Sequence, residues 1–106
     1  MQARGAERND VVLLPIPFTD LTSRKIRQAI VVGRKGTELF VVPVSSVLSN
    51  TDFLLQEWQG AGLNVPSGVK AQLATVEERL LVKIIGSVAA VDRQSLDEKL
   101  RTWLQL

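Results

Sequence analysis

Residues 28–44 read QAIVVGRKGTELFVVPV, two apolar runs that flank a short polar segment containing glycine. Each run is rich in β-branched residues and is short, so we predict strands at 28–33 and 39–44. The polar residues 34–37 between them predict a β-hairpin loop. A run of the same kind at residues 11–16 precedes them. Together the three runs predict a three-stranded antiparallel meander.

The second half of the chain continues this pattern with shorter apolar segments. The same β-branched enrichment predicts further strands at residues 52–57, 67–72, 73–76 and 80–88. Gly86 lies inside the last of these segments, where a glycine typically marks a bulge or a sharp bend. We therefore expect a sheet of six or seven short strands, bent near Gly86.

The C-terminal residues change to a helical period. Large apolar side chains recur there at i, i+4, i+7 and i+8, namely at Leu96, Leu100, Trp103 and Leu104. Asp92 is the predicted N-cap of this helix. A chain of 106 residues with 45% hydrophobic content suits one domain, residues 1–106. We predict a mainly β (α+β) fold, a small and partly open β-barrel whose C-terminal helix covers one end, with residues 1–8 poorly ordered.

Residues 21–37 concentrate positive charge. This segment holds five cationic side chains and no carboxylate. The five are Arg24, Lys25, Arg27, Arg34 and Lys35. Because arginine offers planar, bidentate hydrogen bonding to phosphate oxygens, a basic loop between strands predicts contact with a polyanion. The alternative interpretation is a solvated hairpin loop that binds nothing.

The chain contains no cysteine and no histidine. Their absence excludes disulfides, thiolate zinc sites and cysteine nucleophiles, and it removes the commonest general acid–base group. Any catalysis must therefore use arginine, lysine, carboxylates or hydroxyls. No run approaches the roughly 18 consecutive apolar residues of a membrane span, and the polar N-terminus lacks the apolar core of a signal peptide. We expect a soluble, cytoplasmic protein without metal or cofactor.

Several short blocks of sequence resemble the PemK/MazF family of bacterial toxins. They are NDVVLLPIPFTDL at 9–21, RQAIVV at 27–32, VVPVSS at 41–46, WQGAGL at 58–63, LATV at 73–76 and IIG at 84–86. The family typically reads GDIVLVPFPFTD, then RPALVL, then a strand that ends PITS. Each block alone is weak, but their order and spacing together are specific. The resemblance implies an SH3-like barrel that acts as a homodimer, cleaves single-stranded RNA and binds a cognate antitoxin.

The resemblance also implies roles for single residues. In the family the arginine that begins the second block is catalytic, and the hydroxyl residue two positions after the strand-ending proline acts with it. Here these are Arg27, as stabiliser of transition-state charge, and Ser45, as donor to a phosphate oxygen. Arg24, Lys25 and Ser46 are expected to contact RNA. The alternatives are a surface charge for Arg27 and an ordinary turn serine for Ser45.

Two departures from the family pattern affect the expected chemistry. Gln28 replaces the proline that usually follows the arginine. Some members use an Arg-x-Asp pair further on as acid and base, and the corresponding residues here are Lys70 and Gln72. A neutral glutamine cannot act as a base, although Lys70 can still donate a proton or bind phosphate. Asp20 is then the next candidate carboxylate, and its alternative role is to accept backbone hydrogen bonds.

Three functions are therefore open on this sequence. The first is a metal-independent endoribonuclease toxin, and the second is a catalytically weakened member that keeps RNA or antitoxin binding. The third is a CcdB-like toxin that acts on gyrase through protein contacts. Trp58 and Phe53 are candidate platforms for unpaired bases, with burial in the core as the alternative. Trp103 is expected in the core.

Overall fold

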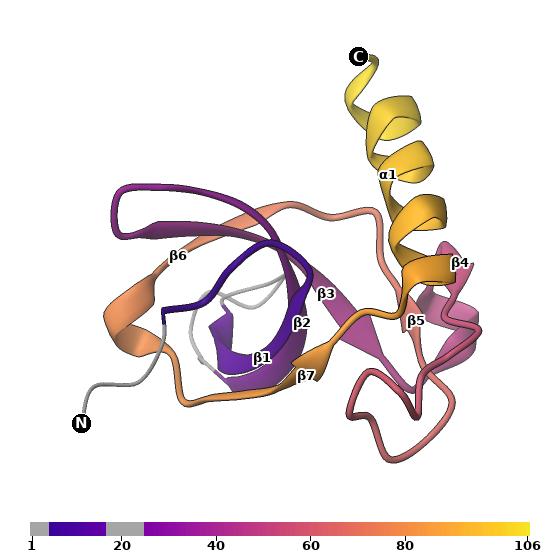
Figure 1. Ribbon diagram of the computed structural model, residues 1–106, viewed down its shortest axis with the longest axis horizontal. Coiled ribbons are helices and arrows are strands. Elements are labelled where there is room, and N and C mark those ends of the chain that lie inside the picture. The colour runs from indigo at the N-terminus through magenta and orange to yellow at the C-terminus, as the bar shows by residue number, and fades with distance from the viewer. Residues whose placement is uncertain (1–4, 17–24) are drawn as a thin grey trace.

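The computed structural model describes residues 5–16 and 25–106 and shows an antiparallel sheet followed by one helix (Figure 1). The strands are β1 (Asp10–Ile16), β2 (Lys25–Lys35), β3 (Glu38–Ser45), β4 (Phe53–Leu54), β5 (Gly68–Val69), β6 (Ala74–Glu77) and β7 (Lys83–Ser87). Two 3-10 turns, η1 (Leu48–Asn50) and η2 (Glu78–Leu80), and the helix α1 (Ala90–Leu104) complete the described elements. The strand order is β4-β5-β3-β2-β1-β7, with β6 also paired to β3. The sheet is not closed, which confirms the predicted partly open barrel with a C-terminal helix.

The predicted meander is confirmed, and its hairpin is tighter than expected. β1, β2 and β3 pair antiparallel in succession. Lys35 pairs with Glu38, so the connection between β2 and β3 has only two residues. Gly36 occupies the left-handed region there, with φ of 58°, which a glycine adopts without strain. Because β2 extends to Lys35, the predicted basic loop is in fact largely strand.

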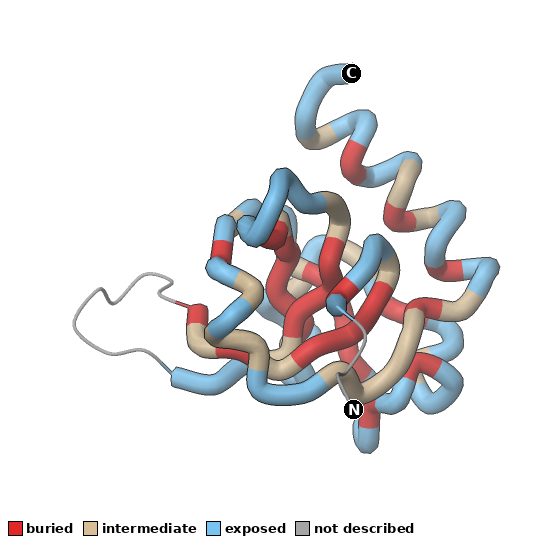
Figure 2. Tube along the Cα trace, turned by 60° about the vertical axis from the view of Figure 1, so that its left-hand side comes forward, coloured by how far each residue is buried: buried red, intermediate tan, exposed pale blue. Residues whose placement is uncertain are grey.

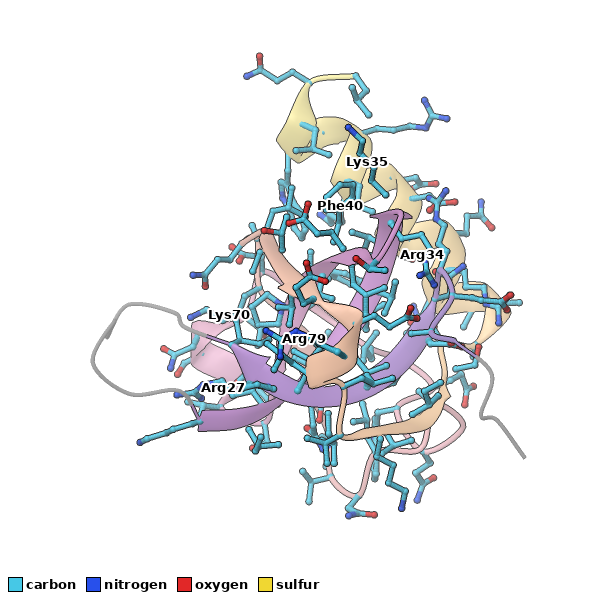
Figure 3. The ribbon with its side chains drawn as sticks, turned by 90° about the vertical axis from the view of Figure 1, so that its left-hand side faces the viewer. Arg27, Arg34, Lys35, Phe40, Lys70 and Arg79 are labelled. Atoms are coloured by element: carbon cyan, nitrogen blue, oxygen red, sulfur yellow. The ribbon has the colours of Figure 1, made fainter. Side chains whose placement is uncertain are left out.

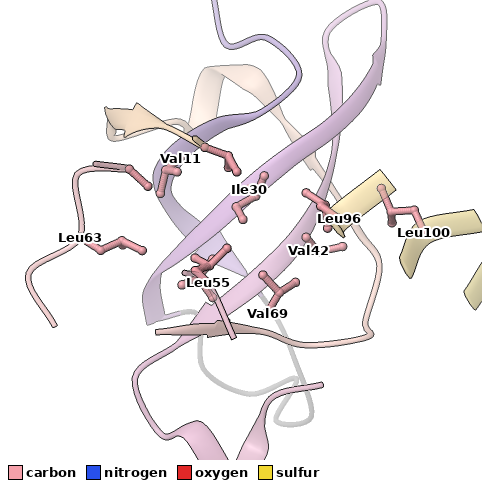
Figure 4. Packing of buried hydrophobic residues seen from close by; sticks show 11 residues of the cluster. Val11, Ile30, Val42, Leu55, Leu63, Val69, Leu96 and Leu100 are labelled. Atoms are coloured by element: carbon pink, nitrogen blue, oxygen red, sulfur yellow. The ribbon is translucent and has the colours of Figure 1, made fainter. Parts of the chain in front are cut away.

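Side chains alternate along these strands and build one apolar cluster on each face of the sheet. Val11 and Ile30 belong to the cluster on the helix side, which also contains Leu96 of α1 (Figure 4). Val12 and Ala29 belong to the second cluster, enclosed by the bend of the sheet. Figure 2 shows buried residues through the middle of the sheet and at intervals along α1. Both faces of β1 and β2 are thus buried, as continuous apolar runs predict.

The predicted irregularity near Gly86 is confirmed. The register between β1 and β7 shifts so that Val11 pairs with Gly86 and Val12 pairs with Ile84. A Cβ atom at Gly86 would collide with the carbonyl oxygen of Ala61. Gly86 therefore permits the backbone of residues 61–62 to lie directly against β7.

Helix α1 begins before its predicted N-cap. Ala89 is the residue that precedes the helix, and Asp92 lies inside the first turn, 1% exposed. The carboxylate of Asp92 accepts hydrogen bonds from the backbone N–H groups of Gln56 (2.9 Å) and Glu57 (2.8 Å). The predicted N-cap role is wrong, because Asp92 instead ties the chain after β4 to the helix.

Two predicted strands are much shorter than expected. Within residues 52–57 only β4 forms, because the chain then turns to give its N–H groups to Asp92. Within residues 67–72 only β5 forms, because the N–H of Gln72 donates to the carbonyl of Lys70 at 2.8 Å and closes a three-residue turn. Hydrogen bonds to the distant Asp92 replace the sheet pairing after β4, and the local turn replaces it after β5.

The described part of the N-terminal segment contacts η2 and α1. Within residues 1–8, the described residues 5–8 include Ala6, which is fully buried. The N–H of Ala6 donates to Glu78 at 3.0 Å, and Arg8 forms an ion pair with Asp97 of α1 at 2.6 Å. Among the described helices, none is long and apolar enough to cross a membrane.

Candidate functional site

Arg27 and Ser45 lie at facing positions where β2 and β3 diverge. The last pair between these strands at this end is Ala29 with Pro43. Arg27 and Ser45 each lie two residues beyond that pair, so the register places them opposite each other. Because side chains two apart point to the same face, both project from the face that carries Ala29.

A rigid strand holds the backbone of Arg27. Arg27 still pairs with Leu14 of β1, although it lies beyond the pairing with β3. Its side chain is exposed, whereas Leu14 is fully buried. Arg27 is therefore an exposed residue on a backbone that the strand holds at the rim of the sheet.

Lys70 joins these two residues from the next strand. Its N–H donates to the carbonyl of Pro43 at 3.0 Å, so Lys70 continues the β3–β5 register just past the end of β5. Val69 points into the helix-side cluster, and alternation turns Lys70 to the opposite face. That face also carries Ser45, which the register places diagonally from Lys70. We refer to Arg27, Ser45 and Lys70 as the basic edge.

Figure 3 shows Arg27 and Lys70 at one side of the molecule and Arg34 and Lys35 toward another part of it. Lys25, at the start of β2, adds an exposed cation to the basic edge. Asp20 and Arg24 lie outside the described residues. Among the described residues, Lys25, Arg27 and Lys70 thus contribute positive charge to this region, and Figure 3 shows Arg79 on the same side of the view.

Ser45 has both a turn role and an available donor. Its Oγ accepts a hydrogen bond from the N–H of Val47 at 3.0 Å, the pattern of a serine turn. A hydroxyl that accepts one bond can still donate its own proton. The turn bond therefore fixes the position of Oγ and leaves its O–H free to reach a phosphate oxygen. Ser46 is exposed next to it.

Gln72 does not belong to the basic edge. It lines a cavity of about 150 Å³ between the sheet and α1, together with Leu73, Leu100 and Trp103. The three-residue turn after β5 separates it from Lys70, whereas the sequence places the two as a pair.

Arg34 has a structural partner at the far end of β2. Its guanidinium forms two hydrogen bonds with Glu78, at 2.8 and 3.0 Å, and donates to the carbonyls of Ala6 and Gly36. These hydrogen bonds to Glu78 raise the pKa of Arg34, and the hydrogen bonds from Arg34 lower the pKa of Glu78. The basic stretch read from the sequence is thus divided between the exposed start of β2 and an ion pair at its end.

The aromatic residues pack with the core. Phe53, Trp58 and Trp103 are partly buried against the helix-side cluster. This confirms the core interpretation for all three and leaves no described support for stacking of bases on Phe53 or Trp58. Among the described residues, no group of three carboxylates or other ligands could hold a metal ion.

Asp52 is a residue of this region that the sequence did not identify. It precedes β4, and its carboxylate accepts a hydrogen bond from the N–H of Ala71 at 2.6 Å. The pairing of Phe53 with Val69 places Asp52 opposite Lys70, next to the basic edge. The only sequence signal is an aspartate in a turn-rich segment, a pattern typical of backbone capping.

Comparison with known structures identifies the fold. The Mycobacterium tuberculosis toxin MazF-mt6 matches with a TM-score of 0.73 and 19% identity, over 92% of this chain and 97% of that chain. An endoribonuclease in complex with its cognate antitoxin from a mycobacterial species matches with a TM-score of 0.72 and 14% identity, over 98% and 97%. No protein-family model and no curated protein sequence matches the chain. The chain therefore has the MazF-like fold, which confirms the resemblance at the level of structure.

Proposed function

We propose that this protein is the toxin of a toxin–antitoxin pair and cleaves single-stranded RNA without a metal ion. The observation that carries the proposal is the register that brings Arg27, Ser45 and Lys70 to one edge of the sheet. Solved proteins with the same fold include a MazF toxin and an endoribonuclease bound to its antitoxin. A guanidinium, a hydroxyl and an ammonium at one edge form a phosphate-binding set.

The chemistry that suits these residues uses the nucleophile of the substrate. The ribose 2′-oxygen attacks the adjacent phosphorus, and the bond from phosphorus to the 5′-oxygen breaks. The products are a 2′,3′-cyclic phosphate and a free 5′-hydroxyl. Arg27 stabilises the charge of the phosphorane, Ser45 donates to a phosphate oxygen, and Lys70 binds phosphate or protonates the leaving oxygen.

The general base must be a group other than Gln72. Gln72 is neutral and lines the cavity beside α1. Asp20 lies outside the described residues and stays the candidate. The position of Gln72 favours a second candidate function, a weakened member of the same fold that binds RNA or antitoxin and cleaves slowly.

The partners follow from the same proposal. An acidic, disordered antitoxin segment would cover the basic edge and compete with RNA. We further propose that the protein acts as a homodimer in the cytoplasm. Sedimentation equilibrium of the purified protein tests the dimer, which a monomer at micromolar concentration would contradict.

One experiment tests the activity. The purified protein is incubated with long single-stranded RNA in excess EDTA, and the ends of any fragments are mapped. Cuts with 2′,3′-cyclic phosphate ends support the proposal. Intact RNA with measurable binding supports the weakened member instead, and RNA that is neither cut nor bound contradicts both.

A further inference from the structure

Asp52 holds the chain on both sides of Lys70. Its carboxylate Oδ2 accepts a hydrogen bond from the N–H of Ala71 at 2.6 Å. Its own N–H donates to the carbonyl of Val69 at 2.8 Å. The residues before and after Lys70 are therefore both bonded to Asp52.

Two more hydrogen bonds complete the clamp around Lys70. The N–H of Lys70 donates to the carbonyl of Pro43 at 3.0 Å, and the carbonyl of Lys70 accepts from the N–H of Gln72 at 2.8 Å. β5 itself has only two residues, so a long ladder does not fix this position. The direction of the Lys70 side chain depends on the clamp, of which the carboxylate of Asp52 is the only side-chain member described.

We propose that Asp52 is a positioning residue of the RNA site, acting through Lys70. This inference rests on the proposed function, and specifically on contact between Lys70 and an RNA phosphate. Charge alone gives Asp52 the opposite effect, because a carboxylate repels phosphate. If Asp52 positions Lys70, removing its carboxylate weakens RNA binding. If Asp52 only repels phosphate, removing its carboxylate tightens RNA binding.

The bond to Ala71 also separates positioning from general-base catalysis. An asparagine at position 52 can accept the same N–H through its amide oxygen, whereas it cannot remove a proton. If Asp52 acts by positioning Lys70, the Asp52→Asn variant should keep its function. If Asp52 acts as a base, the Asp52→Asn variant should lose cleavage.

The test measures the affinity of the full chain for a single-stranded RNA of mixed sequence with 2′-O-methyl riboses, which cannot be cleaved. The variants are Asp52→Ala, Asp52→Asn, Lys70→Ala and the double alanine variant. Glu98→Ala is the matched control, because Glu98 is an exposed carboxylate on α1 and its loss changes the net charge equally. Fluorescence anisotropy at two salt concentrations gives both the affinity and its salt dependence.

We expect Asp52→Ala to weaken binding by about threefold, within the roughly one- to fivefold range that a single solvent-exposed ion pair contributes. Asp52→Asn should bind like the wild type, and Glu98→Ala should bind equally or more tightly. The double variant should bind no more weakly than Lys70→Ala. Loss of one phosphate contact should also reduce the salt slope by about 0.7 for Lys70→Ala, with a smaller reduction for Asp52→Ala.

Failure of this inference differs from failure of the proposed function. A wild-type protein that does not bind the RNA overturns the proposed function. A wild-type protein that binds, with an Asp52→Ala variant that binds as tightly or more tightly, overturns only the role of Asp52. Normal binding but lost cleavage in Asp52→Asn would assign Asp52 as a base and also overturn it. If circular dichroism shows that Asp52→Ala does not fold, Asp52→Glu is used in its place. This variant keeps the negative charge and moves the oxygen that accepts the hydrogen bond from Ala71, so it should also weaken RNA binding.

Discussion

Replacing Arg27 with alanine should remove cleavage while the fold stays intact. The side chain of Arg27 is exposed, and alanine keeps the backbone pairing of this position with Leu14. Exposed substitutions of this kind typically change the free energy of unfolding by less than about 0.5 kcal/mol. Any large loss of activity must then come from the missing guanidinium.

The size of the loss can be worked out from the exposed position of Arg27. A unit charge about 4 Å from the developing phosphorane charge contributes roughly 4 kcal/mol at the effective dielectric constant of a protein surface. Removal of one transition-state donor commonly lowers kcat by about 100- to 1,000-fold, which is the same range. Because water screens an open edge, we expect a loss near the lower limit, about 100-fold.

The assay is single-turnover cleavage of a long single-stranded RNA, with thermal unfolding measured on the same samples. Arg101→Ala is the matched control, because Arg101 is an exposed arginine on α1. Arg27→Lys should retain part of the rate, since it keeps the charge and loses the bidentate geometry. If Arg27→Ala cleaves within a few-fold of the wild type, Arg27 is not part of the site.

Four further predictions concern chemistry and stability. Cleavage should persist in excess EDTA and should fail on RNA with a 2′-O-methyl group at the cut position; restoration by a divalent metal after loss in EDTA would refute the mechanism. Gln72→Asp should lower the melting temperature without raising the rate, because Gln72 lines the cavity beside α1; a faster enzyme would show that this position reaches the RNA. Asp92→Ala should reduce the free energy of unfolding by about 3 kcal/mol in urea, since two backbone N–H groups lose their acceptor. An effect below about 1 kcal/mol would contradict a stabilising role for the hydrogen bonds of Asp92 to Gln56 and Glu57. The hydrogen bond from Arg34 lowers the pKa of Glu78. The ionised Glu78 carboxylate therefore stabilises the fold fully above its ordinary pKa of 4.5, and this stabilisation is lost as the pH falls below that value. The difference in the free energy of unfolding between the wild type and Glu78→Gln should shrink as the pH is lowered through this range.

The sequence predicts those elements whose signal is local. The apolar runs of β1, β2 and β3 are continuous because both faces of these strands are buried, and the helical period of α1 reflects one buried stripe. These elements, and the bulge beside Gly86, follow from patterns within a few residues. The resemblance to known toxins adds the fold, and comparison with solved structures confirms it.

The remaining features depend on partners that are distant in the chain. Asp92 has the residue type of an N-cap, and only the fold shows that it faces Gln56 and Glu57. The five cations of the basic stretch lie within residues 24–35, and the length of β2 separates Arg34 from Arg27. Lys70 reaches Ser45 only through the register of β5 with β3, which no spacing in the sequence encodes.

The hydrogen bonds between Asp92 and the chain after β4 couple the opening of α1 to the opening of that turn. Asp92 joins α1 to backbone groups 35 and 36 residues earlier, so an opening that detaches the helix must also release that turn. The amides of Gln56 and Glu57 should therefore exchange with deuterium as slowly as the hydrogen-bonded amides in the middle of α1, although they lie outside regular structure. The turn at residues 70–72 has an exposed centre and lacks such a tie to the helix, so it opens in smaller events. We therefore expect slow exchange around α1 and faster exchange at the rim that holds the proposed RNA site.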